Sequence, residues 1–88
     1  EATPLKRESL AIRQRLFGDN DARTALAMLG LAMNLNFVGQ FPESEVWFRK
    51  ALATNTALYG TEHPATATIA NSRLTAMFST FTARHVNI

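Results

Sequence analysis

The side chains that could hold a metal or transfer a proton are few, and their spacing does not build a site. A metal site needs several His, Cys or carboxylate ligands at helical or hairpin spacing. The chain has no cysteine and two histidines, His63 and His85, with no such set of ligands arranged around either. His63 precedes Pro64, where its ring can cap a helix that the proline begins. We therefore expect no metal and no cofactor, and a capping role for His63.

Glu43 and Glu45 are a pair of carboxylates of the kind that general acid–base catalysis uses. Both follow Pro42 in the first turn of an expected helix, where the helix dipole favours negative charge. No Ser/His/Asp arrangement or glycine-rich phosphate loop is recognisable elsewhere in the chain. We expect capping rather than catalysis, and we do not expect an enzyme.

Four basic residues share the first segment of the chain. They are Lys6, Arg7, Arg13 and Arg15. They could favour an acidic ligand, but a solvated outer face, with Glu1 and Glu8 offsetting the charge, explains them equally well. The net charge is only +2, and nucleic-acid binding would usually show a denser basic stripe or stacking aromatic residues. Nucleic acid is not an expected partner.

Length and composition set further bounds. Eighty-eight residues, 47% of them hydrophobic, suffice for one domain with a modest core, burying roughly 60–65% of the unfolded surface. The absence of cysteine fits a reducing compartment, so a cytoplasmic location is expected. No apolar run approaches the roughly 20 residues that span a bilayer, so we expect a soluble chain without a membrane partner. Because the chain starts at Glu1 rather than at methionine, we interpret it as a fragment or a processed product.

Apolar residues recur at three- and four-residue spacings, which predicts about four helices. The first helix is expected over residues 4–17, and Asp19 or Asp21 can cap the helix that follows. The last is expected over residues 64–82, although its many threonines are weak helix formers. The residues beyond Ala83 are expected to fray.

The segment 22–59 organises the chain, because it predicts two helices of similar length joined by a tight turn. The apolar residues that recur at helical spacing are Ala25, Met28, Leu29, Ala32, Leu35 and Val38 before the turn, and Val46, Trp47, Phe48, Ala51, Leu52 and Leu58 after it. Gly39 can take the positive φ that ends a helix, and Pro42 suits the first turn of the next. The segment therefore predicts an antiparallel helical hairpin, in which Trp47 is expected to pack rather than to recognise a ligand.

The chain also resembles itself at a fixed spacing of about 42 residues, which we call the repeat interval. The pairs at this interval are Arg7 with Arg49, Leu10-Ala11 with Leu52-Ala53, Leu16-Phe17-Gly18 with Leu58-Tyr59-Gly60, and Thr24-Ala25 with Thr66-Ala67. A fixed period of this size is typical of solenoids, whose helix pairs must stack on neighbours to bury their apolar faces.

Several motifs occur in a recognisable order across the middle of the chain. They are Leu31-Ala32, Leu35 and Gly39-Gln40-Phe41 in the first helix and turn, Ser44, Phe48 and Ala51-Leu52 in the second helix, and Gly60-Thr61-Glu62-His63-Pro64 in the connector. These residues resemble the tetratricopeptide repeat in its 42-residue form, found in kinesin light chains and in many microbial multidomain proteins. Two positions depart from the pattern: Lys6 replaces an aromatic residue, and Phe81 replaces the next turn glycine.

The resemblance implies an all-α fold of antiparallel helix-turn-helix repeats, stacked as a right-handed α-solenoid. Residues 4–17 would be the second helix of a preceding repeat, and residues 22–59 a complete repeat. Residues 64–82 would be the first helix of a following repeat or a capping helix. Residues 1–88 would then form one domain.

The resemblance also implies a protein or peptide partner, bound on the concave face that the first helix of each pair lines. The candidate partner-binding residues by position are Leu26, Leu29, Met33, Asn36, Phe37, Asn71 and Phe78, with Thr68 and Thr75 beside them. Asn71 is the best polar candidate, because an amide both donates and accepts hydrogen bonds. For the apolar members, burial against a neighbouring repeat is the alternative.

Two other functions stay open at this point. The outer helices would have apolar faces without neighbours, so the chain could self-associate as a homo-oligomer. It could also be a regulatory segment of a larger enzyme or signalling protein, because repeats of this form are often fused to other domains.

Overall fold

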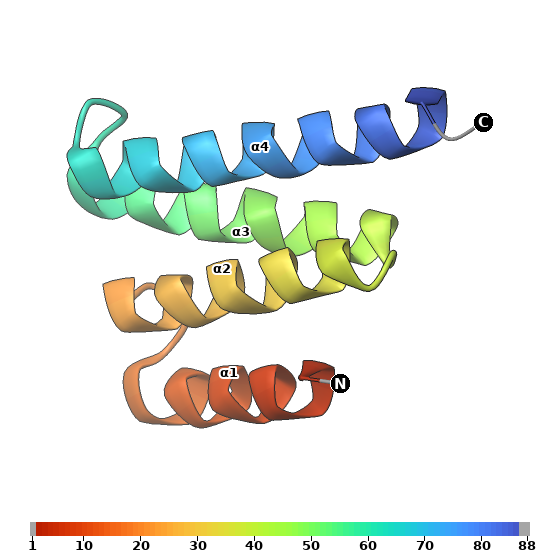
Figure 1. Cartoon of the computed structure of the whole chain (residues 1–88). Coiled ribbons are helices and arrows are strands. Elements are labelled where there is room, and N and C mark those ends of the chain that lie inside the picture. Colours follow the sequence, from red (N-terminus) through yellow and green to blue (C-terminus); the bar gives the residue numbers. More distant parts are fainter. Residues whose placement is uncertain (1, 87–88) are drawn as a thin grey trace.

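A computed structural model describes the backbone of residues 2–86 and the side chains of residues 2–78. Within that range the chain forms four helices and no strand, which confirms the all-α prediction. Successive helices run antiparallel and lie side by side in chain order (Figure 1). The helices are α1 (Thr3–Phe17), α2 (Ala22–Phe37), α3 (Phe41–Tyr59) and α4 (Pro64–Val86).

Glycines end the first three helices, as their positions in the sequence predict. Gly18, Gly39 and Gly60 have φ values of 78°, 88° and 85°, which side chains with a Cβ rarely adopt. After α2, the Gln40 amide donates to the Leu35 carbonyl at 2.8 Å, and the Gly39 amide donates to that of Asn36 at 3.2 Å. This is the Schellman arrangement, and it turns the chain sharply into α3.

Two predicted side-chain caps are present at helix starts. The Asp21 carboxylate accepts from the Arg23 amide at 2.8 Å, at the start of α2. At the start of α4, the His63 Nδ1 accepts from the Ala65 amide at 3.0 Å. Each bond satisfies an amide that lacks a partner inside its helix.

Helix α2 is the centre of the core. It packs against all three other helices, and half of its residues are buried. The buried hydrophobic residues of the structure are Leu10, Ala25, Ala27, Met28, Leu29, Leu31, Ala32, Leu35, Phe48, Ala51 and Ile69. Each large side chain among them contributes about 1.5–3 kcal/mol through burial, so α2 holds the array together.

Two buried threonines form equivalent hydrogen bonds one repeat interval apart. The Thr24 hydroxyl donates to the carbonyls of Gly18 and Arg13, at 2.7 and 3.3 Å. The Thr66 hydroxyl donates to the Asn55 carbonyl at 3.2 Å. Thr66 and Asn55 lie one repeat interval after Thr24 and Arg13. Each bond ties the start of one helix to the helix before it.

Glu43 and Glu45 form ion pairs instead of the predicted cap of α3, and only Glu43 lies in the first turn of that helix. No side chain caps this helix; both carboxylates instead pair with arginines on neighbouring helices. Arg7 of α1 donates to Glu43 at 2.5 and 2.8 Å. Arg73 of α4 donates through Nε to Glu45 at 3.1 and 3.2 Å, and also through Nη2. The hydrogen bonds from Arg7, and then from Trp47, lower the pKa of Glu43 to about 2, and those from Arg73 lower the pKa of Glu45.

Helix α4 is longer than predicted. It continues to Val86, past the expected end at residue 82 and into the residues expected to fray. Phe81 stands one repeat interval after Gly39, and neither glycine nor proline occurs after Pro64. The helix therefore has no residue that would end it. Residues 87 and 88 lie outside the described part of the chain.

Candidate functional site

Helix α2 exposes a stripe of apolar side chains, which we call the α2 stripe: Leu26, Met33 and Phe37. Their exposed fractions are 61%, 50% and 88%. They follow one another by seven and four positions, which keeps them on one side of the helix over a length of about 16 Å. The opposite side of α2 is buried in the core.

The α2 stripe borders a basic side chain from α1. A Cβ added at Gly30, between Leu26 and Met33, would lie 3.7 Å from the Lys6 Nζ and 3.9 Å from its Cδ. The Lys6 side chain therefore reaches over α2 at this glycine. Lys6 occupies the position where the family pattern has an aromatic residue; its equivalent one repeat interval later, Phe48, is buried in the core.

On α4, the positions equivalent to the stripe are polar and uncharged. Thr68 and Thr75, one repeat interval after Leu26 and Met33, are both exposed. The Thr68 hydroxyl donates to the Pro64 carbonyl at 2.9 Å, within its own helix. Because α2 and α4 pack against each other, equivalent positions on the two helices face the same side of the array.

The seven candidate partner-binding residues do not all lie on this surface. Leu29 is 7% exposed and belongs to the same core cluster as Ile69 of α4, so for this residue the alternative of burial within the array applies in place of an open surface. Asn36 is half-buried, at the edge of the α2 stripe. The burial of Leu29 follows from the packing of α4 on that side of α2.

Asn71 and Phe78 are exposed on α4. Asn71 is the equivalent of Leu29, one repeat interval later, and is exposed because α4 is the last of the four helices. Phe78 lies with Leu74 and Met77, which are 71%, 62% and 50% exposed respectively. The equivalents of Leu74 and Met77 on α2 are Ala32 and Leu35, which are buried. This second patch therefore corresponds to the face of α2 that another helix covers.

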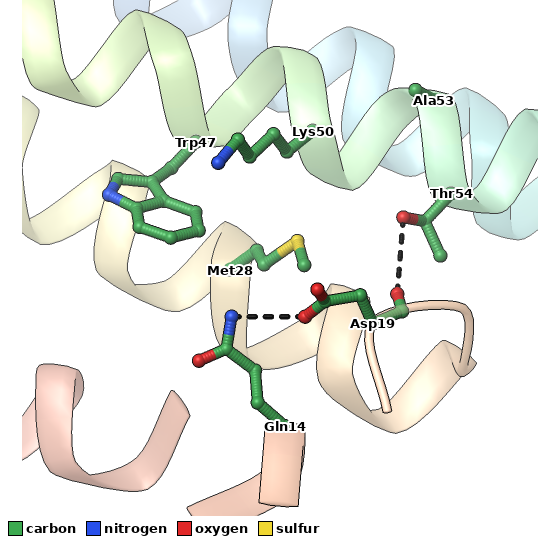
Figure 2. A pocket seen from close by; sticks show the side chains of 7 residues that line it. All are labelled: Gln14, Asp19, Met28, Trp47, Lys50, Ala53 and Thr54. Atoms are coloured by element: carbon green, nitrogen blue, oxygen red, sulfur yellow. Dashed lines mark hydrogen bonds between the residues drawn. The ribbon is translucent and has the colours of Figure 1, made fainter. Parts of the chain in front are cut away.

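A cavity of about 230 Å³ lies between α1, α2 and α3 (Figure 2). It is lined by Gln14, Asp19, Met28, Trp47, Lys50, Ala53 and Thr54. Gln14 donates to the Asp19 carboxylate at 3.0 Å, and the Thr54 hydroxyl donates to the Asp19 carbonyl at 3.4 Å. The volume suits about one amino-acid side chain, below the range typical of small-molecule sites.

Trp47 forms one wall of the cavity and packs against the core, as predicted for this residue. Its indole N–H donates to Glu43 at 3.2 Å, and the Lys50 ammonium lies 4.7 Å from its ring centroid. Glu43 therefore binds the N–H edge of the ring, and Lys50 lies over its face. The side chains around the cavity form no nucleophile–base pair.

The described residues include no group of three or more His, Cys, Asp or Glu that could hold a metal ion. No helix in the same part of the chain combines the length and hydropathy needed to cross a membrane.

Matches to one known family model together cover most of this helical array. The family model described as tetratricopeptide repeat matches residues 1–54 and, separately, residues 23–79. The chain belongs to the tetratricopeptide repeat family. The two matches overlap over most of α2 and α3, the hairpin predicted to be the complete repeat. Searches of curated proteins and of solved structures found no significant match.

Membership of the tetratricopeptide repeat family sets the class of function. Tetratricopeptide repeats generally mediate protein–protein interaction and typically bind protein partners. They are scaffolds and are generally not catalytic. The exposed surfaces of the array are therefore where its function has to be sought.

Sequence reasoning missed the side chains that connect different helices. Arg7 with Glu43 and Arg73 with Glu45 are 36 and 28 residues apart in the chain, and Lys6 reaches Gly30 of the next helix. Opposite charges were visible in the sequence, but nothing local links either ion pair. For Arg7 and Glu43, the one indication in the sequence was the repeat interval, which makes α1 and α3 equivalent helices of successive repeats.

Proposed function

We propose that this tetratricopeptide array is an interaction scaffold that binds a peptide or helix of a partner protein on its concave face. The observation that carries the proposal is the α2 stripe, where Leu26, Met33 and Phe37 expose half or more of their surface. An apolar cluster of this kind marks an interaction site more often than isolated exposed residues do. Asn71, exposed on α4, would add hydrogen bonds to the partner.

We also propose that the repeats are of the 42-residue form. Three kinds of observation support this interval. Helices α1 and α3 end one repeat interval apart, at Phe17 and Tyr59, and α2 and α4 begin one interval apart, at Ala22 and Pro64. The side-chain caps Asp21 and His63 have the same spacing, as do the buried threonines.

A site-specific photo-cross-linking experiment tests the proposed face. A photo-reactive amino acid is placed at position 37 in one variant and at position 16 of α1 in its control, where Leu16 is 68% exposed. The captured partner is purified, and its affinity is measured for Phe37→Asp, Asn71→Ala and Leu16→Asp. We expect about a tenfold loss with Phe37→Asp, a smaller loss with Asn71→Ala, and no change with Leu16→Asp. Equal losses for Phe37→Asp and Leu16→Asp, or a parallel loss of helicity, would contradict the proposal.

Self-association is the second candidate, and the exposed faces of the outer helices favour it. Leu5 and Leu16 of α1 are 71% and 68% exposed, and Leu74 and Phe78 of α4 are 62% and 71% exposed. A second copy could cover both faces. Sedimentation over a hundredfold concentration range should then show a dimer or larger species, dissociated by Leu16→Asp with Leu74→Asp. A monomer of 9.7 kDa throughout the range would rule this candidate out.

A further inference from the structure

We infer that the partner segment on this face is an amphipathic helix rather than an extended peptide, and that it sets an acidic side chain against Lys6. This inference rests on the proposed function and names the partner that the same face would accept. It follows from the hydrogen-bonding capacity of the face, from its charges and from the spacing of the α2 stripe.

The first argument concerns the backbone of the partner. An extended peptide needs hydrogen bonds for its own amides and carbonyls when contact removes them from water. The side chains of Leu26, Met33 and Phe37 cannot form them. Asn34 is already engaged with the Thr3 hydroxyl at 2.5 Å, and Thr68 donates within α4. Asn71 and Thr75 are exposed on α4, but two side chains cannot pair the amides and carbonyls of an extended segment about five residues long, which is what about 16 Å accommodates. A helix satisfies its own backbone and loses nothing on this surface.

The second argument concerns charge. Neither α2 nor α4 contains an aspartate or glutamate. The arginines with described side chains on these helices, Arg23 and Arg73, are paired with Asp21 and Glu45. Lys6 forms no ion pair within the described part of the chain, and its ammonium lies beside Gly30 at the edge of the stripe. An acidic group on the α1 side of the partner would complement it.

The third argument concerns dimensions. The stripe covers about 16 Å along α2, or about three helical turns. A partner helix of similar length would present apolar residues at spacings of three, four and seven, which form one continuous side. Its uncharged polar residues would lie toward Thr68 and Thr75. The acidic residue would lie at the opposite edge, toward Lys6.

Selection from a displayed peptide library tests this inference on the full chain. The library mixes two 18-residue formats with the same randomised positions: an alanine- and glutamine-rich format that forms a helix, and a format interrupted by prolines that cannot. Expected winners have the helical format, apolar residues at spacings of three, four and seven, and aspartate or glutamate beside them. The selected peptide is then synthesised and its affinity is measured by fluorescence anisotropy.

Variants then locate the bound peptide. Met33→Asp should weaken binding about tenfold or more, whereas Leu16→Asp, the exposed control on α1, should leave it unchanged. Lys6→Glu should weaken binding about two- to fivefold, the range of a single surface ion pair, and raising the salt concentration should reduce that difference. Circular dichroism of each variant checks that the fold is retained.

Each other outcome has a separate meaning. Enrichment of proline-containing peptides that still require Met33 would overturn the helix inference and leave the proposed function standing. Binding that is indifferent to Lys6→Glu would overturn the charge assignment. Peptides unaffected by Met33→Asp, or a homodimer dissociated by Met33→Asp, would overturn both the inference and the proposed face.

Discussion

At the scale of single residues, Thr24 shows how a buried hydroxyl joins two helices. Its side chain is fully buried and donates to the Gly18 carbonyl at 2.7 Å. Thr24→Val keeps the shape and removes this donor, so we expect a loss of about 1–2 kcal/mol in the free energy of unfolding. Urea denaturation measures it. Thr75→Val, at an exposed position of α4, is the control and should stay within about 0.5 kcal/mol of the parent.

Glu43 gives a pH-dependent prediction. Its pKa falls from 4.5 to about 2 in the folded chain, first because Arg7 and then because Trp47 donates to its carboxylate. A lowered carboxyl pKa stabilises the fold above pH 4.5, and this contribution disappears as the pH falls toward 2. The side chain is 38% exposed, so the contribution is about 1 kcal/mol or less.

Glu43→Gln tests this contribution directly. Urea unfolding at pH 6, 4 and 2.5 should show the parent more stable than the variant at pH 6, with the difference shrinking as the pH falls. Glu45 and Asp21 also have lowered pKa values, but they are common to both proteins and cancel in the comparison. A difference that is constant with pH would show that the Arg7–Glu43 pair does not contribute as an ion pair.

Sequence reasoning succeeded for residues whose partners are local. Asp21 and His63 each bond an amide two positions ahead, and such spacing is readable in a sequence. For Leu29 both burial and partner contact stayed open, because its periodicity places it near the exposed stripe and only the packing of α4 buries it. Lys6 was recognised as unusual for its position, but its contact with Gly30 requires the three-dimensional arrangement of α1 and α2.

At the scale of elements, helix α2 and the turn that follows it contain two glycines in different backbone conformations. Gly30 lies inside the helix, and an added Cβ would make only ordinary contacts with Lys6, at 3.7 and 3.9 Å. Gly39 follows the helix with φ +88° and has no atom within 4 Å of an added Cβ. Space is therefore available at both positions, and only the backbone conformation separates them.

The two glycine-to-alanine variants should change stability in opposite directions. Gly30→Ala should stabilise the chain by about 0.5–1 kcal/mol, because alanine is the better helix former. Gly39→Ala should destabilise it by about 1–2 kcal/mol, because alanine is strained at positive φ. Thermal and urea unfolding of both variants provide the measurement. Destabilisation by Gly30→Ala would mean that Lys6 cannot adjust to the added methyl group.

The number and order of helices were predictable because periodicity and helix-ending residues agree. Glycines follow three of the helices, and prolines lie in the first turns of α1 and α3 and at the start of α4. Helix α4 extends to Val86, past the predicted end at residue 82, where its threonine-rich composition suggested early fraying; the interpretation of this segment as a capping helix had allowed a longer helix. Each threonine lowers the helix propensity only slightly. A helix ends more readily at a residue such as glycine, and here Phe81 occupies the position where the repeat pattern has that glycine.

At the scale of the whole molecule, stability should be graded along the stack. In a solenoid each helix contacts mainly its neighbours, so the outer helices have fewer contacts that must break before they open. We expect amide hydrogen exchange to be slowest in α2 and α3 and faster in α1 and α4. Mass spectrometry of peptides from the exchanged chain measures this order. Uniform protection across all four helices would show that the array opens only as one unit.

Matched variants of α4 sharpen that measurement. Ile69 is 3% exposed and belongs to the core cluster, whereas Leu74 is 62% exposed. Ile69→Ala should lower the free energy of unfolding by about 2–4 kcal/mol and accelerate amide hydrogen exchange first in α4. Leu74→Ala should have little effect on either quantity. If Ile69→Ala accelerated amide exchange equally in α2 and α4, the two helices would open together.

Glu43 and Glu45 have a mechanical consequence for the array. Residues two positions apart on a helix point about 200° apart, and these two are tied to helices on opposite sides of α3, to Arg7 of α1 and Arg73 of α4. Rotation of α3 about its long axis would strain or break these two ion pairs. Together they therefore favour one rotational setting of α3 between α1 and α4.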